Sequence, residues 1–398
     1  MNALLDLRLR EGRIVETGAD LSARDGEETI DACGAYVAPG FIDMHVHLRE
    51  PGNPEKETLR SGTAAAVAGG FTAVAAMPNT NPPMDSAQIV RACSYRKPVE
   101  GSASCRVYPI AALTRGREGG ELLDYAALKR AGAVAFSDDG STVMNARVLY
   151  DAAAAARRVQ GCFIVHCEDA DLKGDAARNT PANRLAEDTI VARDVAIAQE
   201  TGKAWHIAHV STRGALDAVV QARASGTSIT CEVTPHHLVF TDNAVDELGS
   251  RAKVNPPLRS QADVDALRAG VMNGAIDVFA CDHAPHTEEE KTAALDCGAV
   301  GFSGLEIAAA AYAYALPALP VSRFVEMISC NPARILNVPG GTLKPGSPAD
   351  VTIFAERAWK VDPDSFRSKG KSTPFAGMML PRKVLVTIVE GMVKYRNA

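Results

Sequence analysis

The sequence predicts an α/β fold, a (β/α)8 TIM barrel with a small β-sandwich domain formed by both chain ends. In the central region, short apolar runs rich in β-branched residues alternate with longer alanine-rich stretches, which indicates parallel strands joined by helices. Eight such units occupy roughly 250 to 300 residues, and this length suits a closed barrel better than an open sheet. Short alternating strands near both chain ends predict the second, smaller domain.

The eight predicted strands are apolar on both faces, as expected of strands buried between a barrel core and outer helices. They are residues 40–47, 71–77, 106–113, 133–137, 162–166, 204–210, 228–234 and 276–281. A glycine usually follows each predicted helix, because glycine is favoured just past a helix C-terminus. The predicted helices include residues 59–68, 125–131, 143–159, 186–201, 212–225 and 262–273.

The chain ends follow a different pattern, in which short strands alternate with turns. The predicted strands are residues 4–9, 12–17, 29–37, 350–354 and 384–393, and the turn-rich segment 338–349 precedes the last two. We therefore expect residues 1–38 and 339–398 to form one small composite β-domain. Residues 39–338 are expected to form the barrel.

Composition and charge argue against several classes of protein. The chain has 398 residues, of which 46% are hydrophobic and 23% charged, as in ordinary globular proteins. Its formal net charge of −6 argues against binding to nucleic acid or to a membrane surface. No apolar run approaches the roughly 20 residues of a membrane span, and the first ten residues lack the apolar stretch of a signal peptide. The nine cysteines are scattered without a Cys-x-x-Cys pair, so we expect a reducing, cytoplasmic location.

Residues that bind metals lie at the ends of five predicted strands. Barrels of this kind carry their active sites at the carboxyl ends of the strands, so these side chains would meet at one rim. His45 and His47 are separated by one residue, and side chains at positions i and i+2 of a strand point to the same side. The other candidates are Asp138 or Asp139, His166, His209 and Asp282. Nitrogen and oxygen donors of this kind are the ligands that zinc prefers.

The two carboxyl groups have different expected roles. Only one of Asp138 and Asp139 need reach a metal, because an aspartate before Gly140 is also typical of an Asx turn. The carboxylate that does so has two oxygens and could bridge two ions. Asp282 could bind the metal and also accept a proton from water.

Three further residues follow or end the seventh predicted strand. Of His236 and His237, we expect one to support the site through a hydrogen bond and the other to be structural. For Glu232 two interpretations stay open, a buried partner of the site and a simple ion pair.

Eight motifs, spread over nearly the whole chain, form a specific combination. They are residues 39–52 (PGFIDMHVHLREPG), 76–80 (AMPNT), 136–140 (FSDDG), 166–169 (HCED), 232–238 (EVTPHHL), 253–259 (KVNPPLR), 282–286 (DHAPH) and 372–375 (STPF). This combination resembles the bacterial class I dihydroorotases of the amidohydrolase superfamily. The His-x-His pair alone marks only the wider superfamily.

The resemblance implies a role for each candidate residue. It implies one or two zinc ions per subunit, bound by His45, His47, Asp139, His166, His209 and Asp282. It makes Asp139 the bridging ligand, where many relatives use a carboxylated lysine, and makes Asp282 also the catalytic acid and base. The implied substrate contacts are Arg49, Asn79, Asn255, His286, and the backbone at Val300 and Gly301.

The implied reaction is the reversible cyclisation of N-carbamoyl-L-aspartate to (S)-dihydroorotate in de novo pyrimidine biosynthesis. Zinc would polarise the amide carbonyl and lower the pKa of a water molecule. Asp282 would take the proton and deliver it to the leaving nitrogen, and would do the reverse in cyclisation. Arg49, with Asn79 and His286, would hold the α-carboxylate, which explains how an acidic protein binds an anion.

Two alternatives stay open at this point. Another cyclic amidohydrolase, such as an allantoinase or a hydantoinase, would have the same barrel, but Asp139 in place of lysine and the set of Arg49, Asn79 and His286 argue against it. A non-catalytic scaffold subunit of aspartate transcarbamoylase typically loses metal ligands, whereas this chain keeps all six. A homodimer and an association with aspartate transcarbamoylase are both compatible with the sequence.

The stretch between His166 and His209 is shorter than expected for the family. The loop that carries the shortening comprises residues 171–180. Because this loop lies near the predicted rim, we expect altered substrate access or altered subunit contacts.

Overall fold

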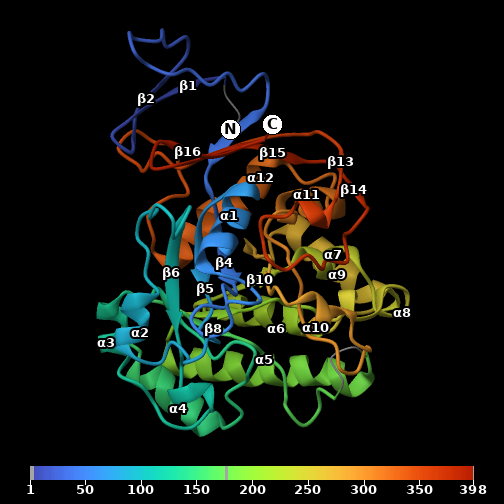
Figure 1. Cartoon of the computed structure of the whole chain (residues 1–398). Helices are drawn as coiled ribbons and strands as arrows, with labels where there is room; N and C mark the ends of the chain where they lie inside the picture. The colour runs from blue at the N-terminus through green and yellow to red at the C-terminus, as the bar shows by residue number, and fades with distance from the viewer. Residues whose placement is uncertain (1–3, 175–177, 398) are drawn as a thin grey trace.

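Eight parallel strands form the centre of the molecule, in a computed structural model that describes residues 4–174 and 178–397 (Figure 1). Each strand pairs with the next one along the chain. They are β4 (Phe41–Val46), β5 (Phe71–Ala76), β6 (Arg106–Ala111), β7 (Ala135–Phe136), β8 (Phe163–Val165), β9 (Trp205–Ile207), β10 (Ile229–Val233) and β11 (Val278–Phe279). A parallel bridge between Val46 and His283 brings the chain after β11 against β4. The predicted barrel is therefore confirmed, with all eight strands in the predicted places.

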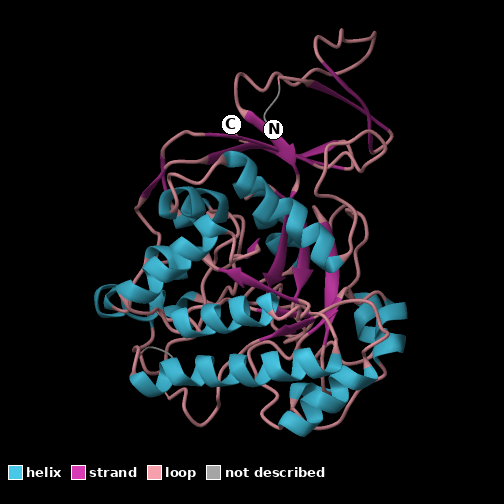
Figure 2. Ribbon diagram, turned by 180° about the vertical axis from the view of Figure 1, so that it is seen from behind, coloured by secondary structure: helices cyan, strands magenta, loops and turns pink. Residues whose placement is uncertain are grey.

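Helices lie outside the strands and cover the barrel (Figure 2). The longer ones are α1 (Leu59–Ala68), α3 (Tyr125–Ala131), α4 (Ala146–Ala155), α5 (Pro181–Thr201), α6 (Arg213–Ala224), α9 (Gln261–Asn273) and α11 (Ala308–Ala315). Shorter helices are α2 (Ala87–Ala92), α7 (Pro235–Val239), α8 (Asn243–Leu248), α10 (Glu288–Thr292), α12 (Val321–Val325) and α13 (Asn331–Leu336). In the described part of the chain, no helix combines the length and the apolar character that a membrane crossing requires.

Capping residues explain where the helices agree with the prediction and where they differ. Helix α1 has the predicted bounds, because the Thr58 side chain accepts a hydrogen bond from the Ser61 N–H at its start. Helix α5 starts five residues earlier than predicted, because Thr180 caps it and Pro181 suits the first turn. Helix α4 is shorter than predicted, because Asn145 caps it at residue 146.

Antiparallel sheets from both chain ends lie beside the barrel (Figure 1). β3 (Tyr36–Pro39), β12 (Val351–Ala355), β15 (Lys383–Val389) and β16 (Met392–Arg396) form one sheet, and β1 (Asp6–Arg10) and β2 (Arg13–Gly18) form another. Leu7 and Leu9 of β1 pack against an apolar cluster that includes Val351 and Val386. The two sheets thus face each other as the expected small sandwich, while the boundaries at residues 38/39 and 338/339 stay predictions.

Three details of this region differ from the prediction. Of residues 29–37, only the last two belong to a strand, β3, and Cys33 and Gly34 have positive φ angles of 49° and 77°, which interrupt an extended backbone. Residues 384–393 fall in two strands, because the chain turns at Glu390 and Gly391. A small ladder of β13 (Trp359–Lys360) and β14 (Met379–Leu380) was not predicted.

A buried aromatic cluster joins the barrel to the four-stranded sheet. The Phe41 ring lies 5.9 Å from the Phe71 ring, 5.6 Å from that of Phe324 and 5.7 Å from that of Phe354, measured between centroids. Aromatic rings at these separations bury large apolar areas and pack with defined geometry. Strand β4 is therefore held on two sides, and the histidine pair at its end has a rigid base.

Candidate metal centre and active site

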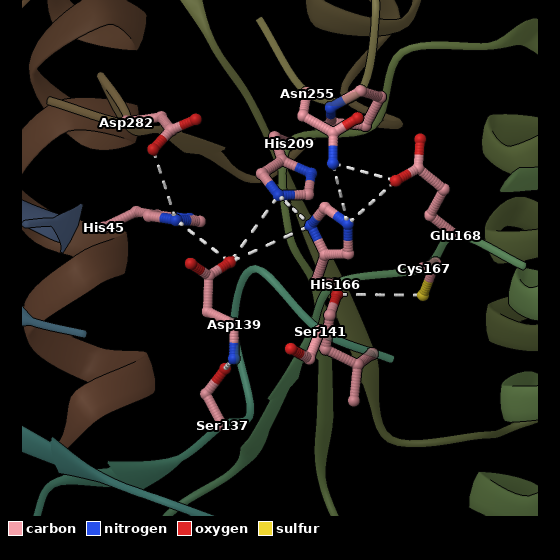
Figure 3. Close-up of polar contacts among 12 residues, drawn as sticks. His45, Ser137, Asp139, Ser141, His166, Cys167, Glu168, His209, Asn255 and Asp282 are labelled. Atoms are coloured by element: carbon pink, nitrogen blue, oxygen red, sulfur yellow. Dashed lines mark hydrogen bonds and ion pairs between the residues drawn. The ribbon is translucent and has the colours of Figure 1, made fainter. Parts of the chain in front are cut away.

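Six residues predicted to bind metal meet at one rim of the barrel, and Figure 3 shows five of them. They are His45 in β4, His47 directly after β4, Asp139 after β7, His166 after β8, His209 after β9 and Asp282 after β11. All except Asp282 are buried. Because the strands are parallel, their carboxyl ends converge on this rim, which brings together residues that lie far apart in the sequence.

The carboxylate of Asp139 lies between four histidine rings. Its Oδ1 is 3.3 Å from His45 Nε2 and 3.7 Å from His209 Nε2. The same oxygen is 3.9 Å from His166 Nδ1, and Oδ2 is 3.6 Å from His47 Nε2. A carboxylate whose two oxygens face different histidines has the donor arrangement of a ligand that two metal ions can share.

Asp282 lies beside the histidine pair and is the most exposed of the six. Its Oδ1 is 3.0 Å from His47 Nε2 and 3.5 Å from His45 Nε2. Its side chain is 12% exposed, against 4% for Asp139. Burial favours the neutral acid, but the charges of His45 and His47 outweigh it and hold the pKa of Asp282 well below its usual range. The carboxylate is therefore ionised and accessible from the rim.

Two groups among the described residues could each hold a metal ion. One comprises His45, Asp139 and His209, and the other His45, His47 and Asp282, with ligand atoms within 4.8 Å of one another. His45 Nε2 and Asp139 Oδ1 are buried and have no hydrogen-bond partner. Buried polar atoms are normally satisfied, and a cation between these donors would satisfy both atoms. The residues therefore fit a metal ion.

Glu232, on β10, orients the imidazole ring of His45. His45 Nδ1 lies 2.6 Å from Glu232 Oε1, so an Nδ1–H donates to the carboxylate and Nε2 is turned toward Asp139. The other oxygen, Oε2, is 3.0 Å from His206 Nε2. Burial alone would raise the pKa of Glu232, but His45 and His206 lower it to about 2. Of the two interpretations left open by the sequence, the buried partner of the site is the one observed.

Two asparagines, Asn79 and Asn255, lie beside His47 and His166, respectively. Asn79 Oδ1 lies 2.8 Å from His47 Nδ1 and accepts its hydrogen, which points Nε2 at Asp282. Asn255 Nδ2 donates to Glu168 Oε2 over 2.8 Å and lies 3.4 Å from His166 Nε2 (Figure 3). Both predicted substrate contacts thus lie next to the metal groups.

The other predicted substrate contacts form a second cluster on the rim. Arg49 Nε donates to the Pro285 carbonyl over 3.1 Å, and Arg49 Nη2 lies 3.1 Å from His286 Nε2. His286 Nε2 is 2.9 Å from the Val300 carbonyl. Burial and the charge of Arg49 lower the pKa of His286 to about 3, so its imidazole is neutral. The Arg49 guanidinium is the cation beside this neutral imidazole, and Glu290 Oε2, which lies 3.2 Å from His286 Nδ1, is paired with Lys56.

Gly301 follows Val300 at a place where only glycine fits. Its φ is +109°, and a Cβ there would lie 2.5 Å from the Cβ of Ala284. Its N–H donates to the Lys253 carbonyl over 2.9 Å. The loop after β11 is thereby held close to the rim.

The neighbour of Asp139 has a structural role. The Asp138 carboxylate accepts hydrogen bonds from the backbone N–H groups of Leu113 and Thr114, at 2.8 and 3.2 Å. These bonds tie the turn after β7 to the end of β6. Of the two aspartates, Asp139 is therefore the one that reaches the metal groups.

The structural role expected for one of His236 and His237 is confirmed, whereas the hydrogen bond to the site expected of the other is not formed. His237 Nδ1 bonds to Thr234 Oγ1 at 2.7 Å, and Nε2 donates to the Pro256 carbonyl at 3.0 Å. His236 is buried and has no hydrogen-bond partner at either ring nitrogen, and its ring packs on Phe302. Neither ring is hydrogen-bonded to a residue of the metal groups.

Sequence reasoning missed three residues that hold the site. His206 contacts Glu232, and Glu168 Oε2 lies 3.4 Å from His166 Nε2. Arg117 Nη2 donates to the backbone carbonyl of Asp139. One signal was available for His206, because a polar side chain inside a short apolar strand needs a buried partner.

The shortened loop after β8 is only partly described, because residues 175–177 lie outside the described residues. At its described end, Asn179 Nδ2 donates to Asp242 Oδ2 over 2.7 Å, just before α8. The effect of the shortening on access or assembly stays a prediction.

Known proteins resemble this chain in sequence and in fold. Residues 36–394 match the amidohydrolase family. A dihydroorotase of Pelotomaculum thermopropionicum is 45% identical over 98% of this chain and 93% of its own length. A dihydroorotase of Caldanaerobacter subterraneus subsp. tengcongensis is 44% identical over 92% and 88%. An L-hydantoinase (dihydropyrimidinase) from Arthrobacter aurescens has a TM-score of 0.87 at 24% identity, covering 98% of this chain and 92% of that one, a likeness of fold alone.

Proposed function

Because this chain belongs to the amidohydrolase family, we propose that it catalyses the dihydroorotase reaction, the reversible cyclisation of N-carbamoyl-L-aspartate to (S)-dihydroorotate, at a zinc centre. The observation that carries the proposal is the convergence of four histidines and two aspartates beside the Arg49 cluster. The relatives named dihydroorotase, which are 45% and 44% identical to it, support the choice of reaction.

The metal would be held by the six residues at the rim, as one or two zinc ions. Imidazole nitrogens and carboxylate oxygens are common zinc ligands. When bound, the metal supplies a Lewis acid that polarises the substrate's amide carbonyl. Glu232 and Asn79 accept the Nδ1 hydrogens of His45 and His47, so that each ring turns its Nε2 toward the centre, where a bound metal would replace the Nε2 proton.

Asp282 would carry the proton in both directions. Its ionised carboxylate is partly accessible at the rim, and its Oδ1 lies 3.0 Å from His47 Nε2. In ring opening it would accept a proton from the attacking water and deliver it to the leaving amide nitrogen. In cyclisation it would take the proton from the carbamoyl nitrogen and give it to the departing oxygen. One carboxylate therefore serves both directions.

The Arg49 cluster would bind the carboxylate of the substrate. A guanidinium fork pairs with a carboxylate through two parallel hydrogen bonds. Arg49 lies next to the neutral ring of His286, and Asn79 lies beside His47. Asn255 and the backbone at Val300 and Gly301 would complete the contacts. The positive charge of Arg49 thus attracts an anionic substrate locally, although the chain has a net charge of −6.

The decisive experiment combines metal analysis with an assay of Asp282→Asn. We expect zinc in the purified wild type, and a loss of turnover in the variant by a factor of about 10² to 10⁴ with an unchanged thermal unfolding curve. The matched control is Asp296→Asn, an exposed aspartate in the same loop, which should keep full activity. Undiminished turnover in Asp282→Asn would refute the acid–base role.

Substrate tests separate the dihydroorotase reaction from its alternatives. Turnover should be found with carbamoyl-aspartate and dihydroorotate. Turnover of allantoin or dihydrouracil alone would replace the proposed reaction by that of another cyclic amidohydrolase. Co-purification with aspartate transcarbamoylase, without turnover when zinc is supplied, would instead indicate a scaffold subunit. A homodimer, a complex with the transcarbamoylase and a cytoplasmic location stay predictions of the sequence.

A further inference from the structure

A cavity of about 440 Å³ opens at the end of the barrel opposite to the metal rim. It lies where β8, β9 and β10 begin, next to the ends of α4 and α5. Trp205 starts β9 and lines the cavity, whereas His209 lies four residues further along, about 13 Å away at the usual rise of a strand. The cavity is therefore separate from the candidate active site.

The lining of this cavity is cationic. Arg157, Arg158, Lys203 and Arg334 all line it, and its lining includes no aspartate or glutamate. The three arginines are exposed, while Lys203 is only 3% exposed. Within residues 4–174 and 178–397, none of the four forms an ion pair. In a chain with a net charge of −6, four uncompensated cations around one hollow attract anions.

Helix ends explain only part of this charge. Helices α4 and α5 end beside the cavity, and the partial negative charge of a helix C-terminus favours nearby cations. Lys203 is also held by a carbonyl in the connection after α4, since its Nζ donates to the Val159 carbonyl over 2.6 Å. Arg157 and Arg158 make no such bond to a carbonyl in the described part of the chain. Their guanidinium groups are free to bind a ligand.

The neutral polar groups and the size of the cavity indicate that its ligand is larger than a simple inorganic anion. Trp205 is 1% exposed, and its Nε1–H has no hydrogen-bond partner, so a donor is left unsatisfied at the wall. The hydroxyl-bearing side chains of Ser228 and Thr230 line the same hollow. Pockets for small organic ligands measure roughly 300 to 1,000 Å³, so this cavity has room for more than a bare anion.

We propose that this cavity binds a phosphate ester of a small organic molecule, of the size of a nucleoside monophosphate. Arg157 and Arg158 bind the phosphate, because guanidinium groups pair with phosphate oxygens through parallel hydrogen bonds. The organic part lies against Val159 and Ile335, the larger aliphatic side chains of the lining. The site is independent of the proposed reaction, since it shares no residue with the metal rim.

Isothermal titration of the zinc-loaded enzyme with adenosine 5′-monophosphate, at constant ionic strength, tests the proposal. We expect one binding event per chain, with weaker binding of inorganic phosphate. Arg157→Gln and Arg158→Gln should each weaken binding of the nucleotide about tenfold, since each removes one charged hydrogen-bonding partner. The matched control is Arg10→Gln, an exposed arginine in β1, which should leave binding unchanged.

Enzyme assays and one active-site variant complete the test. Arg157→Gln and Arg158→Gln should keep wild-type turnover, which shows that the fold is intact. Arg49→Gln should bind the nucleotide as the wild type does. The proposal is overturned by any of three results: no binding to the wild type, equal binding in the wild type and both cavity variants, or loss of binding in Arg49→Gln. Inorganic phosphate that binds as tightly as the nucleotide would also overturn it, because the organic part would then have no contacts.

Discussion

At the scale of the residue, two adjacent aspartates after β7 perform different tasks. Neighbouring side chains on an extended backbone point to opposite sides. Asp139 therefore faces the histidines at the rim, while Asp138 faces the backbone N–H groups at the end of β6. The sequence motif contains both residues, and only the direction of each side chain separates a metal ligand from a structural acceptor.

Substitution of each aspartate by asparagine should separate these tasks. Asp139→Asn should lower the affinity for zinc by more than tenfold, because a charged ligand is lost at the centre of the site. Asp138→Asn should keep the metal but lower the free energy of unfolding by about 1–3 kcal/mol, because hydrogen bonds to a buried charged acceptor weaken. Zinc titration against a competing chelator and urea unfolding measure the two effects. Equal loss of zinc in both variants would contradict the assignment.

At the scale of the element, the first residues of β9 combine burial with charge. Lys203 lies just before the strand, above the rings of Phe136 and Phe163. Burial is the main cause that lowers the pKa of Lys203 to about 8, a value that also includes the opposing influence of Cys162 and the lowering influence of Lys129. Between pH 8 and 10.5 the unfolded chain holds this proton while the folded chain has released it. The titration of Lys203 therefore increases the free energy of unfolding as the pH rises through this window.

Comparison with Lys203→Met isolates this effect from the other groups that titrate at alkaline pH. The stability of the wild type, relative to the variant, should increase between pH 8 and pH 10 by up to about 3 kcal/mol, the value of a shift of this size. Urea unfolding at several pH values measures the difference. A difference that stays constant, or that falls as the pH rises, would show that Lys203 titrates normally.

At the scale of the whole molecule, one buried arginine ties the barrel to the terminal sheets. Arg106 starts β6 and forms ion pairs with Asp350, just before β12, and with Glu390, at the turn between β15 and β16. Asp350 also accepts the Glu390 N–H over 2.9 Å. Arg106 and Asp350 are 4% and 3% exposed, so each charge depends on the other for compensation.

Loss of one partner should therefore be costly. Arg106→Met should lower the free energy of unfolding by about 3–5 kcal/mol, because it leaves a buried carboxylate unpaired. The double variant Arg106→Met/Asp350→Asn should recover a large part of that loss. Arg147→Met, which breaks an exposed ion pair with Asp151, should change the free energy of unfolding by less than about 1 kcal/mol. Similar losses in Arg106→Met and Arg147→Met, measured by urea unfolding, would rule out the proposed role of the buried pair.

The barrel, the order of its strands and the rim on which the histidines and aspartates meet can all be predicted from the amino-acid sequence alone. These features depend on local signals, such as apolar runs, capping residues and the position of a side chain at a strand end. The bounds of α1 and α3 were predicted correctly for this reason, because Thr58 and Asp124 cap the helices and glycines follow them.

The pairing of the buried polar residues, in contrast, depends on how the elements pack in the folded chain. His45 and Glu232 are 187 positions apart, and Arg106 and Asp350 are 244 apart, so no local pattern couples them. The same holds for the cationic cavity, where Arg158, in the turn after α4, and Arg334, in α13, are far apart in the sequence. The physical reason is that a buried charge takes its partner from whichever element packs against it, and that packing exists only in the folded chain.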